Sequence, residues 1–96
     1  MKIEFEQQVV EFLSSLGPAP RRALRQALRN LAQEKSDIRP LEAELDGFYR
    51  LRVGRCRVIF LYRSTRRRRQ VRCVFAEHRT IIYEVFARHL HEYLEK

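Results

Sequence analysis

The 96-residue sequence contains no tryptophan, only three glycines and three prolines, and no long apolar run. The three glycines are too widely spaced to form a glycine-rich loop that cradles a phosphate. No run approaches the about 20 apolar residues that span a bilayer, and the first residues, MKIE, lack the apolar segment of a signal peptide. We therefore expect a cytoplasmic protein without membrane contact and, at this length, one domain over residues 1–96.

Cysteine is also scarce. Cys56 and Cys73 each lie in an apolar, strand-like run without C-x-x-C spacing, so we expect two buried free thiols, with a disulfide or a metal site as the alternative. The sequence contains no Ser/His/Asp triad, no paired carboxylates and no His/Cys metal spacing, and His89 and His91 point in different directions on a helix. It therefore predicts no metal, no cofactor and no small-molecule substrate.

Acidic residues are absent from positions 50 to 76, although the chain has twelve elsewhere. The same stretch holds ten of the chain's seventeen arginines, and the formal net charge is +8. A concentrated positive field attracts a polyanion, and the planar fork of arginine suits phosphate. A nucleic acid is therefore the expected partner, while a solvated basic face kept for solubility is the alternative. The ten arginines are those at 50, 52, 55, 57, 63, 66, 67, 68, 69 and 72.

The spacing of apolar residues changes twice along the chain. Helical spacing predicts a helix from Glu6 that Gly17 ends in a left-handed cap, a second helix after Pro20, and a last helix from Thr80. A spacing of two predicts strands between them. The predicted strands cover residues 1–5, 48–53, 56–62 and 71–76, with a linker at 36–40, a loop or irregular strand at 41–45, and an exposed loop or flexible hairpin tip at 64–70. The fold class is α+β, a helical hairpin packed on one face of a small twisted antiparallel sheet, with a C-terminal helix.

The strands on either side of Gly54 and Arg55 form a hairpin with an unusual charge pattern. A two-residue turn pairs Val53 with Cys56 and Arg52 with Arg57. Two arginines directly opposite on one face destabilise a sheet by up to about 1 kcal/mol, and a phosphate between them would relieve the repulsion. We expect this face to look away from the core, so that the fold tolerates the loss of Arg57.

The hairpin and the last strand resemble the RelE/ParE superfamily of type II toxin–antitoxin toxins. The resemblance lies in GFYRLRVGRCRVIFLY followed by VRCVFAEHRTIIY, which follow the family's basic strand pair and its H-R-x-x-x-Y motif, and in the helical hairpin that precedes them. It implies a bacterial or archaeal protein that a cognate antitoxin binds. RelE-like members are metal-independent endoribonucleases that cut mRNA on the ribosome and so inhibit translation, and ParE-like members inhibit DNA gyrase.

The resemblance also implies roles for individual residues. Arg50 and Arg52 fall on positions that contact RNA and the scissile phosphate, although the best-studied RelE-type site has lysines there. Arg57 matches an arginine that stabilises the transition state, Arg79 lies near a second one, and Tyr83 matches a tyrosine near the attacking 2′-hydroxyl. The expected catalytic residues are Arg52, Arg57, His78, Arg79 and Tyr83, and the expected RNA-binding residues are Arg50, Arg55 and Arg72.

The proton transfers of RNA cleavage need groups that titrate. His78 is the first candidate because its ordinary pKa lies near 6.5 and strand alternation could bring it to the edge of the arginine face. Glu77 and Tyr83 are the other candidates, but Glu77 could simply pair with Arg79 or another neighbour and is left out of the expected site. The sequence thus favours a RelE-like ribonuclease, with a ParE-like gyrase inhibitor or a non-catalytic relative that binds antitoxin and nucleic acid as alternatives.

Overall fold

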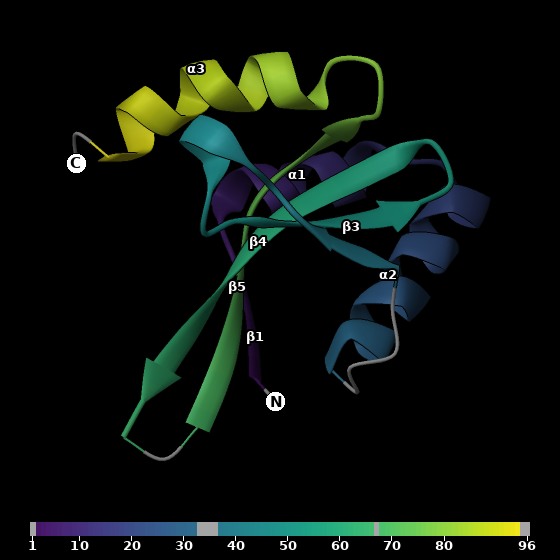
Figure 1. The fold of residues 1–96 in the computed structure, drawn as a ribbon. Coiled ribbons are helices and arrows are strands. Elements are labelled where there is room, and N and C mark those ends of the chain that lie inside the picture. The colour runs from purple at the N-terminus through teal and green to yellow at the C-terminus, as the bar shows by residue number, and fades with distance from the viewer. Residues whose placement is uncertain (1, 33–36, 67, 95–96) are drawn as a thin grey trace.

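In the residues that the computed structural model describes, 2–32, 37–66 and 68–94, five strands form one sheet and three α-helices pack against it (Figure 1). The sheet order is β1-β5-β4-β3-β2. None of these helices is long and apolar enough to cross a membrane. The elements are β1 (Lys2–Phe5), α1 (Gln7–Ser15), α2 (Pro18–Ala32), β2 (Ile38–Pro40), the 3-10 helix η1 (Ala43–Leu45), β3 (Tyr49–Val53), β4 (Cys56–Thr65), β5 (Arg68–His78) and α3 (Ile82–Leu94).

The α+β class predicted from the sequence is confirmed, but the sheet is mixed. Strands β2 to β5 pair antiparallel, as expected, whereas β1 pairs parallel to β5. The parallel pairing arises because α1 and α2 intervene between β1 and the rest of the sheet along the chain, so that β1 is not joined to a neighbour by a tight turn.

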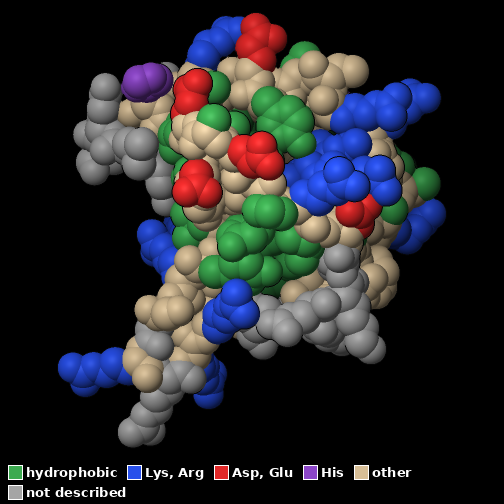
Figure 2. Space-filling model, in the orientation of Figure 1, with side chains coloured by type: hydrophobic (Ala, Val, Ile, Leu, Met, Phe, Trp, Pro, Cys, Tyr) green, Lys and Arg blue, Asp and Glu red, His purple; other side chains and the backbone are tan. Residues whose placement is uncertain are grey.

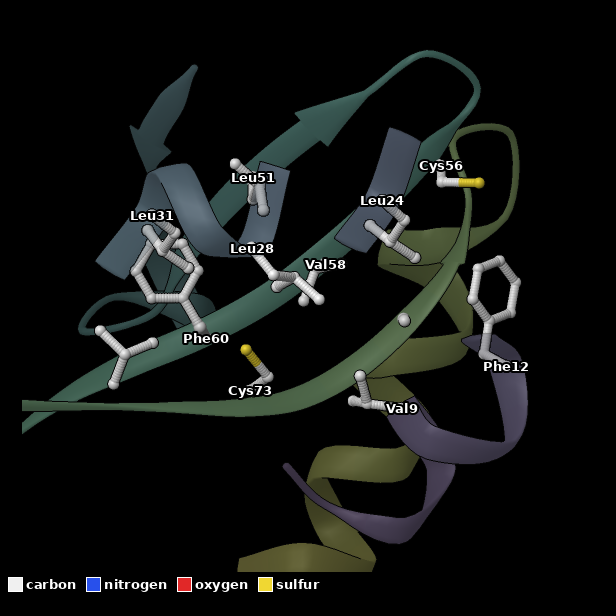
Figure 3. Packing of buried hydrophobic residues seen from close by; sticks show 12 residues of the cluster. Val9, Phe12, Leu24, Leu28, Leu31, Leu51, Cys56, Val58, Phe60 and Cys73 are labelled. Carbon is white, nitrogen blue, oxygen red and sulfur yellow. The ribbon is translucent and has the colours of Figure 1, made fainter. Parts of the chain in front are cut away.

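Helices cover both faces of the sheet, which corrects the prediction that they lie on one face. The leucines of α2 (Leu24, Leu28 and Leu31) and two residues of α1 (Val9 and Phe12) pack on one face, against Leu51, Val58, Phe60 and Cys73 (Figure 3). Helix α3 packs on the other face through Ile82, Phe86 and Leu90, against Ile59, Val74 and Phe75. Strand β4 is therefore buried on both sides, which explains its unbroken apolar run.

The first helix ends differently from the prediction. Leu16 is extended, with φ −78° and ψ 150°, and Gly17 does not adopt a positive φ, so the left-handed cap is wrong. The guanidinium of Arg21 instead donates hydrogen bonds to the carbonyl oxygens of Ser14 (3.1 Å) and Leu16 (2.8 Å). These bonds satisfy acceptors that a helix C-terminus leaves without backbone partners.

The predicted hairpin register is confirmed residue by residue. Arg52 lies opposite Arg57 and Val53 opposite Cys56, and Gly54 takes the positive φ of 58° that this turn requires. The predicted linker is wrong in its described part, because Ile38–Pro40 forms an edge strand on β3. Of the two alternatives predicted for 64–70, the loop is wrong and the hairpin tip is confirmed, since β4 and β5 continue pairing out to Thr65 and Arg68. Ser36 and Arg67 lie outside the described residues.

Candidate active site

Arg57 lies at the centre of the candidate site, in the middle of the sheet near the β3–β4 turn. It is only 9% exposed, so the expectation that it stands clear of the core is wrong. Its Nη1 donates hydrogen bonds of 2.8 Å to the carbonyl oxygens of Gly54 and Cys56. Among the described residues it has no carboxylate in ion-pair contact. A buried cation is thus held by backbone oxygens at the hairpin turn.

Other charged groups surround this guanidinium. Burial lowers the pKa of Arg57 and the charge of Arg50 lowers it further, while Tyr83 opposes them. Arg52 and Arg79 lower the same pKa by smaller amounts. Three arginines and one phenol therefore lie near Arg57, and the site has an excess of positive charge. On the face shown in Figure 2, Lys and Arg side chains gather over the β3–β4 hairpin.

The two arginines of β3 have a partner that sequence reasoning missed. Asp37 accepts from Nε of Arg52 at 2.6 Å and lies 3.8 Å from Nη2 of Arg50. The backbone N–H of Arg52 also donates to the carbonyl oxygen of Asp37. Asp37 reaches them because β2, unrecognised in the sequence, begins directly after it on the edge of β3. The basic strand is therefore partly neutralised by a carboxylate from a segment read as a linker.

The corner between β5 and α3 brings the C-terminal motif to the hairpin. The backbone N–H of Arg79 donates to the carbonyl oxygen of Arg55 at 2.8 Å, which ties this corner to the β3–β4 turn. Tyr83 follows in the first turn of α3 and is 40% exposed. The fold thus brings Arg52, Arg57, Arg79 and Tyr83 into one neighbourhood, and their catalytic roles stay a prediction.

His78 lies on the opposite face of the sheet from Arg57. It is paired with Cys56, and its ring meets Phe12 of α1 edge-on at 5.5 Å. The expectation that strand alternation brings it to the arginine face is therefore wrong. Glu77 occupies the position opposite Arg57 instead, and its Oε1 accepts from the backbone N–H of His78 at 3.0 Å.

Two hollows adjoin His78 at the turn end of the sheet. The first, of about 400 Å³, is lined by Arg55, His78, Arg79 and Thr80. The second, of about 310 Å³, is mainly apolar and runs from the α1–α2 corner to the hairpin turn. Arg55 and His78 line both hollows. The two residues therefore border the site, although the imidazole of His78 does not face Arg57.

Arg72 lies far from these residues along the sheet and is held by two carboxylates. Its Nη1 lies 2.6 Å from Oε2 of Glu4, and its Nη2 lies 2.9 Å from Oε1 of Glu6. These contacts fasten β1 to β5. Its predicted role in RNA binding stays a prediction, which this ion-paired position does not favour. In the described part of the chain, no three His, Cys, Asp or Glu side chains group as metal ligands.

Comparison with known proteins gives matches among solved structures alone, since no protein-family model and no curated protein matches the chain. RelE in the archaeal RelE–RelB complex from Pyrococcus horikoshii is 28% identical, with 81% of this chain and 93% of that chain covered and a TM-score of 0.59. A chain of the RelB–RelE antitoxin–toxin complex from Methanococcus jannaschii is 19% identical, with 86% of this chain and 98% of that chain covered and a TM-score of 0.64. A YoeB/ParE toxin from Agrobacterium tumefaciens is 13% identical, with 81% of this chain and 98% of that chain covered and a TM-score of 0.65.

Proposed function

We propose that the chain is a member of the RelE/ParE superfamily and the toxin of a type II toxin–antitoxin pair, because it shares its fold with YoeB/ParE and RelE toxins and 28% of its aligned residues with RelE from Pyrococcus horikoshii. Its proposed activity is metal-independent cleavage of mRNA on the ribosome in the cytoplasm. The observation that carries this proposal is the neighbourhood of Arg57, in which a buried guanidinium is surrounded by Arg50, Arg52, Arg79 and Tyr83.

This neighbourhood suits the charge that develops when RNA is cleaved. The 2′-oxygen attacks the adjacent phosphorus, a P–O bond to the 2′-oxygen forms, and the bond to the 5′-oxygen breaks. The products are a 2′,3′-cyclic phosphate and a 5′-hydroxyl, and the phosphorane between them carries extra negative charge. Cations that are fixed in place before the reaction stabilise that charge without reorganising. Arg57 is fixed by two backbone carbonyls, and Arg52 lies opposite it.

The proton transfers need a group other than the arginines, because guanidinium does not lose its proton in proteins. Tyr83 lies close enough to Arg57 to influence its pKa and is partly exposed to a substrate. A phenolic oxygen can take part in proton transfer, here as the acceptor of the proton of the 2′-hydroxyl. We assign this step to Tyr83. His78 lies on the opposite face of the sheet from Arg57, so the leaving 5′-oxygen takes its proton from water.

The ion pairs of Asp37 do not prevent phosphate binding. Asp37 is 41% exposed and Arg52 is 56% exposed, and pairs so open to solvent contribute at most about 1 kcal/mol. A phosphate that makes two charged hydrogen bonds offers more than this. We therefore expect RNA to displace the carboxylate of Asp37 from the basic strand.

The experiment is cleavage of ribosome-bound mRNA, read by primer extension, with the purified chain. Arg22, exposed on α2, provides the control for variants of the site: Arg22→Ala removes one positive charge, as Arg57→Ala does, but at a position away from the site. The parent and Arg22→Ala should cut at the same positions and at similar rates. Chemical mapping of the new ends should find cyclic phosphate and 5′-hydroxyl. Intact mRNA with a folded parent protein contradicts the ribonuclease.

The engagement of Arg50 and Arg52 by Asp37 favours a second candidate, a ParE-like inhibitor of DNA gyrase. Such a protein inhibits its target by binding alone and catalyses no reaction. Neutralisation of the basic strand by Asp37 would therefore not impair its function. Induction in a bacterium separates the two functions. A ribonuclease stops amino-acid incorporation before thymidine incorporation, whereas a gyrase inhibitor reverses that order.

The proposed partner is an acidic antitoxin segment that folds on binding. The RelE chains from Pyrococcus horikoshii and Methanococcus jannaschii were solved with RelB, and the excess of positive charge around Arg57 explains why an acidic segment would bind here. Co-expression with the neighbouring small reading frame should restore growth and yield a complex. Continued arrest, with no co-purifying protein, contradicts this partner.

A further inference from the structure

The far end of the β4–β5 hairpin extends beyond the rest of the sheet. β3 stops pairing with β4 at Phe60, and β1 stops pairing with β5 at Gln70. Two pairs lie beyond both neighbours, Ser64 with Arg69 and Thr65 with Arg68, and they follow the pair of Arg63 with Gln70, where β1 ends. We call residues 63–66 and 68–70 the arm. Figure 1 shows it leaving the body of the protein on the side away from α3.

Arginines lie on both faces of this two-stranded ribbon. Because side chains alternate along a strand, Arg63 and Arg68 are on one face and Arg69 is on the other, with Arg66 at the turn. All four are exposed. Arg69 also stacks over the ring of Tyr62, with 4.1 Å between its Cζ and the ring centroid. The arm contains no carboxylate, and arginine lies on both of its faces.

The dimensions of the arm select one kind of polyanion. The two pairs beyond β1 and the turn residue Arg66, at about 3.4 Å each, give a reach of about 10 Å. The major groove of B-form DNA is about 12 Å wide and 8.5 Å deep, and it admits a two-stranded ribbon. The corresponding groove of A-form RNA is too narrow for protein side chains. A ribbon with cations on both faces can reach the phosphates on both walls of the wider groove.

We propose that the arm is a binding site for double-stranded DNA, inserted into the major groove with its arginines on the flanking phosphates. This activity goes beyond RNA cleavage. Thr65 lies eight steps along the extended strand from Arg57, about 27 Å, so the arm and the candidate active site are distinct surfaces. DNA binding therefore stands or falls independently of the ribonuclease.

The test measures fluorescence anisotropy of a 20-base-pair DNA duplex and of an RNA duplex of the same sequence, between about 50 and 200 mM salt. The arm variant is Arg63→Ala with Arg66→Ala. The matched control is Arg22→Ala with Arg25→Ala, which removes two exposed arginines from α2. The parent should bind DNA at least about tenfold more tightly than RNA. The arm variant should lose about two units of salt slope, while the control keeps the slope of the parent.

Three results would overturn the proposal. If the arm variant and the control lose DNA affinity and salt slope by equal amounts, net charge alone attracts DNA. Equal or tighter binding of the RNA duplex would exclude the major-groove geometry. An unchanged DNA affinity in an arm variant that melts at the temperature of the parent would exclude the arm. Cleavage of ribosome-bound mRNA by the same variants reports separately on the proposed ribonuclease.

Discussion

Replacing Arg57 with alanine should reduce both stability and activity, by amounts that the structure sets. Nη1 makes two charged hydrogen bonds with the carbonyl oxygens of Gly54 and Cys56, and such bonds contribute about 1.5–3 kcal/mol each. Against this, the alanine variant removes a buried cation that Arg50, Arg52 and Arg79 repel. We expect a net loss of about 1–2 kcal/mol, which lowers Tm by roughly 4–16 °C in a domain of this size.

The loss of activity should be larger than the loss of stability explains. Removing one preorganised donor from a site that stabilises an oxyanion typically costs about 10²- to 10³-fold in rate. Cleavage is therefore measured well below the Tm of the variant, so that the folded fraction is the same as in the parent. Arg57→Lys keeps the charge but loses the planar fork, and we expect it to recover only part of the rate.

Two outcomes would refute this reasoning about Arg57. If a folded Arg57→Ala protein cuts mRNA at the rate of the parent, the guanidinium does not stabilise the transition state. If the variant is as stable as the parent or more stable, cross-strand repulsion outweighs the bonds to Gly54 and Cys56. The second result would restore the expectation drawn from the sequence alone.

Three further variants test other parts of the fold. Asp37→Asn should strengthen RNA binding and steepen its salt dependence in anisotropy assays, because it releases Arg52; weaker binding contradicts this. Arg72→Ala should lower the unfolding free energy by about 1–2 kcal/mol in urea without slowing cleavage, because it releases Glu4. Burial raises the pKa of Cys73 from 9.0 to about 12, so the unfolded chain loses this proton first and stability falls as pH rises. The parent should lose about 1 kcal/mol more than Cys73→Ala between pH 9 and pH 10.

Local signals in the sequence predicted the parts of the fold that depend on neighbouring residues. Gly54 and Arg55 set the register of the hairpin, and the leucine stripe of α2 gave its buried face. The position of α3 could not be read in this way, because Val58, Ile59 and Phe60 are all apolar and do not mark a face. The arm carried no apolar alternation because both its faces meet solvent. A pattern of burial cannot reveal a strand that buries neither side.

The misplacement of His78 has a single structural cause, a β-bulge in β5. Phe60 pairs with Cys73 and Ile59 pairs with Phe75, so Val74 is an extra residue in the ladder. Strict alternation from Cys73 would bring His78 to the arginine face. The bulge directs Val74 and Phe75 to the same side, under α3, and every later residue of the strand changes face. Glu77 thereby takes the place opposite Arg57. One inserted residue thus decides which titratable group shares a face with the arginines, and because the pairing partner sets a bulge, the strand's own sequence could not predict it.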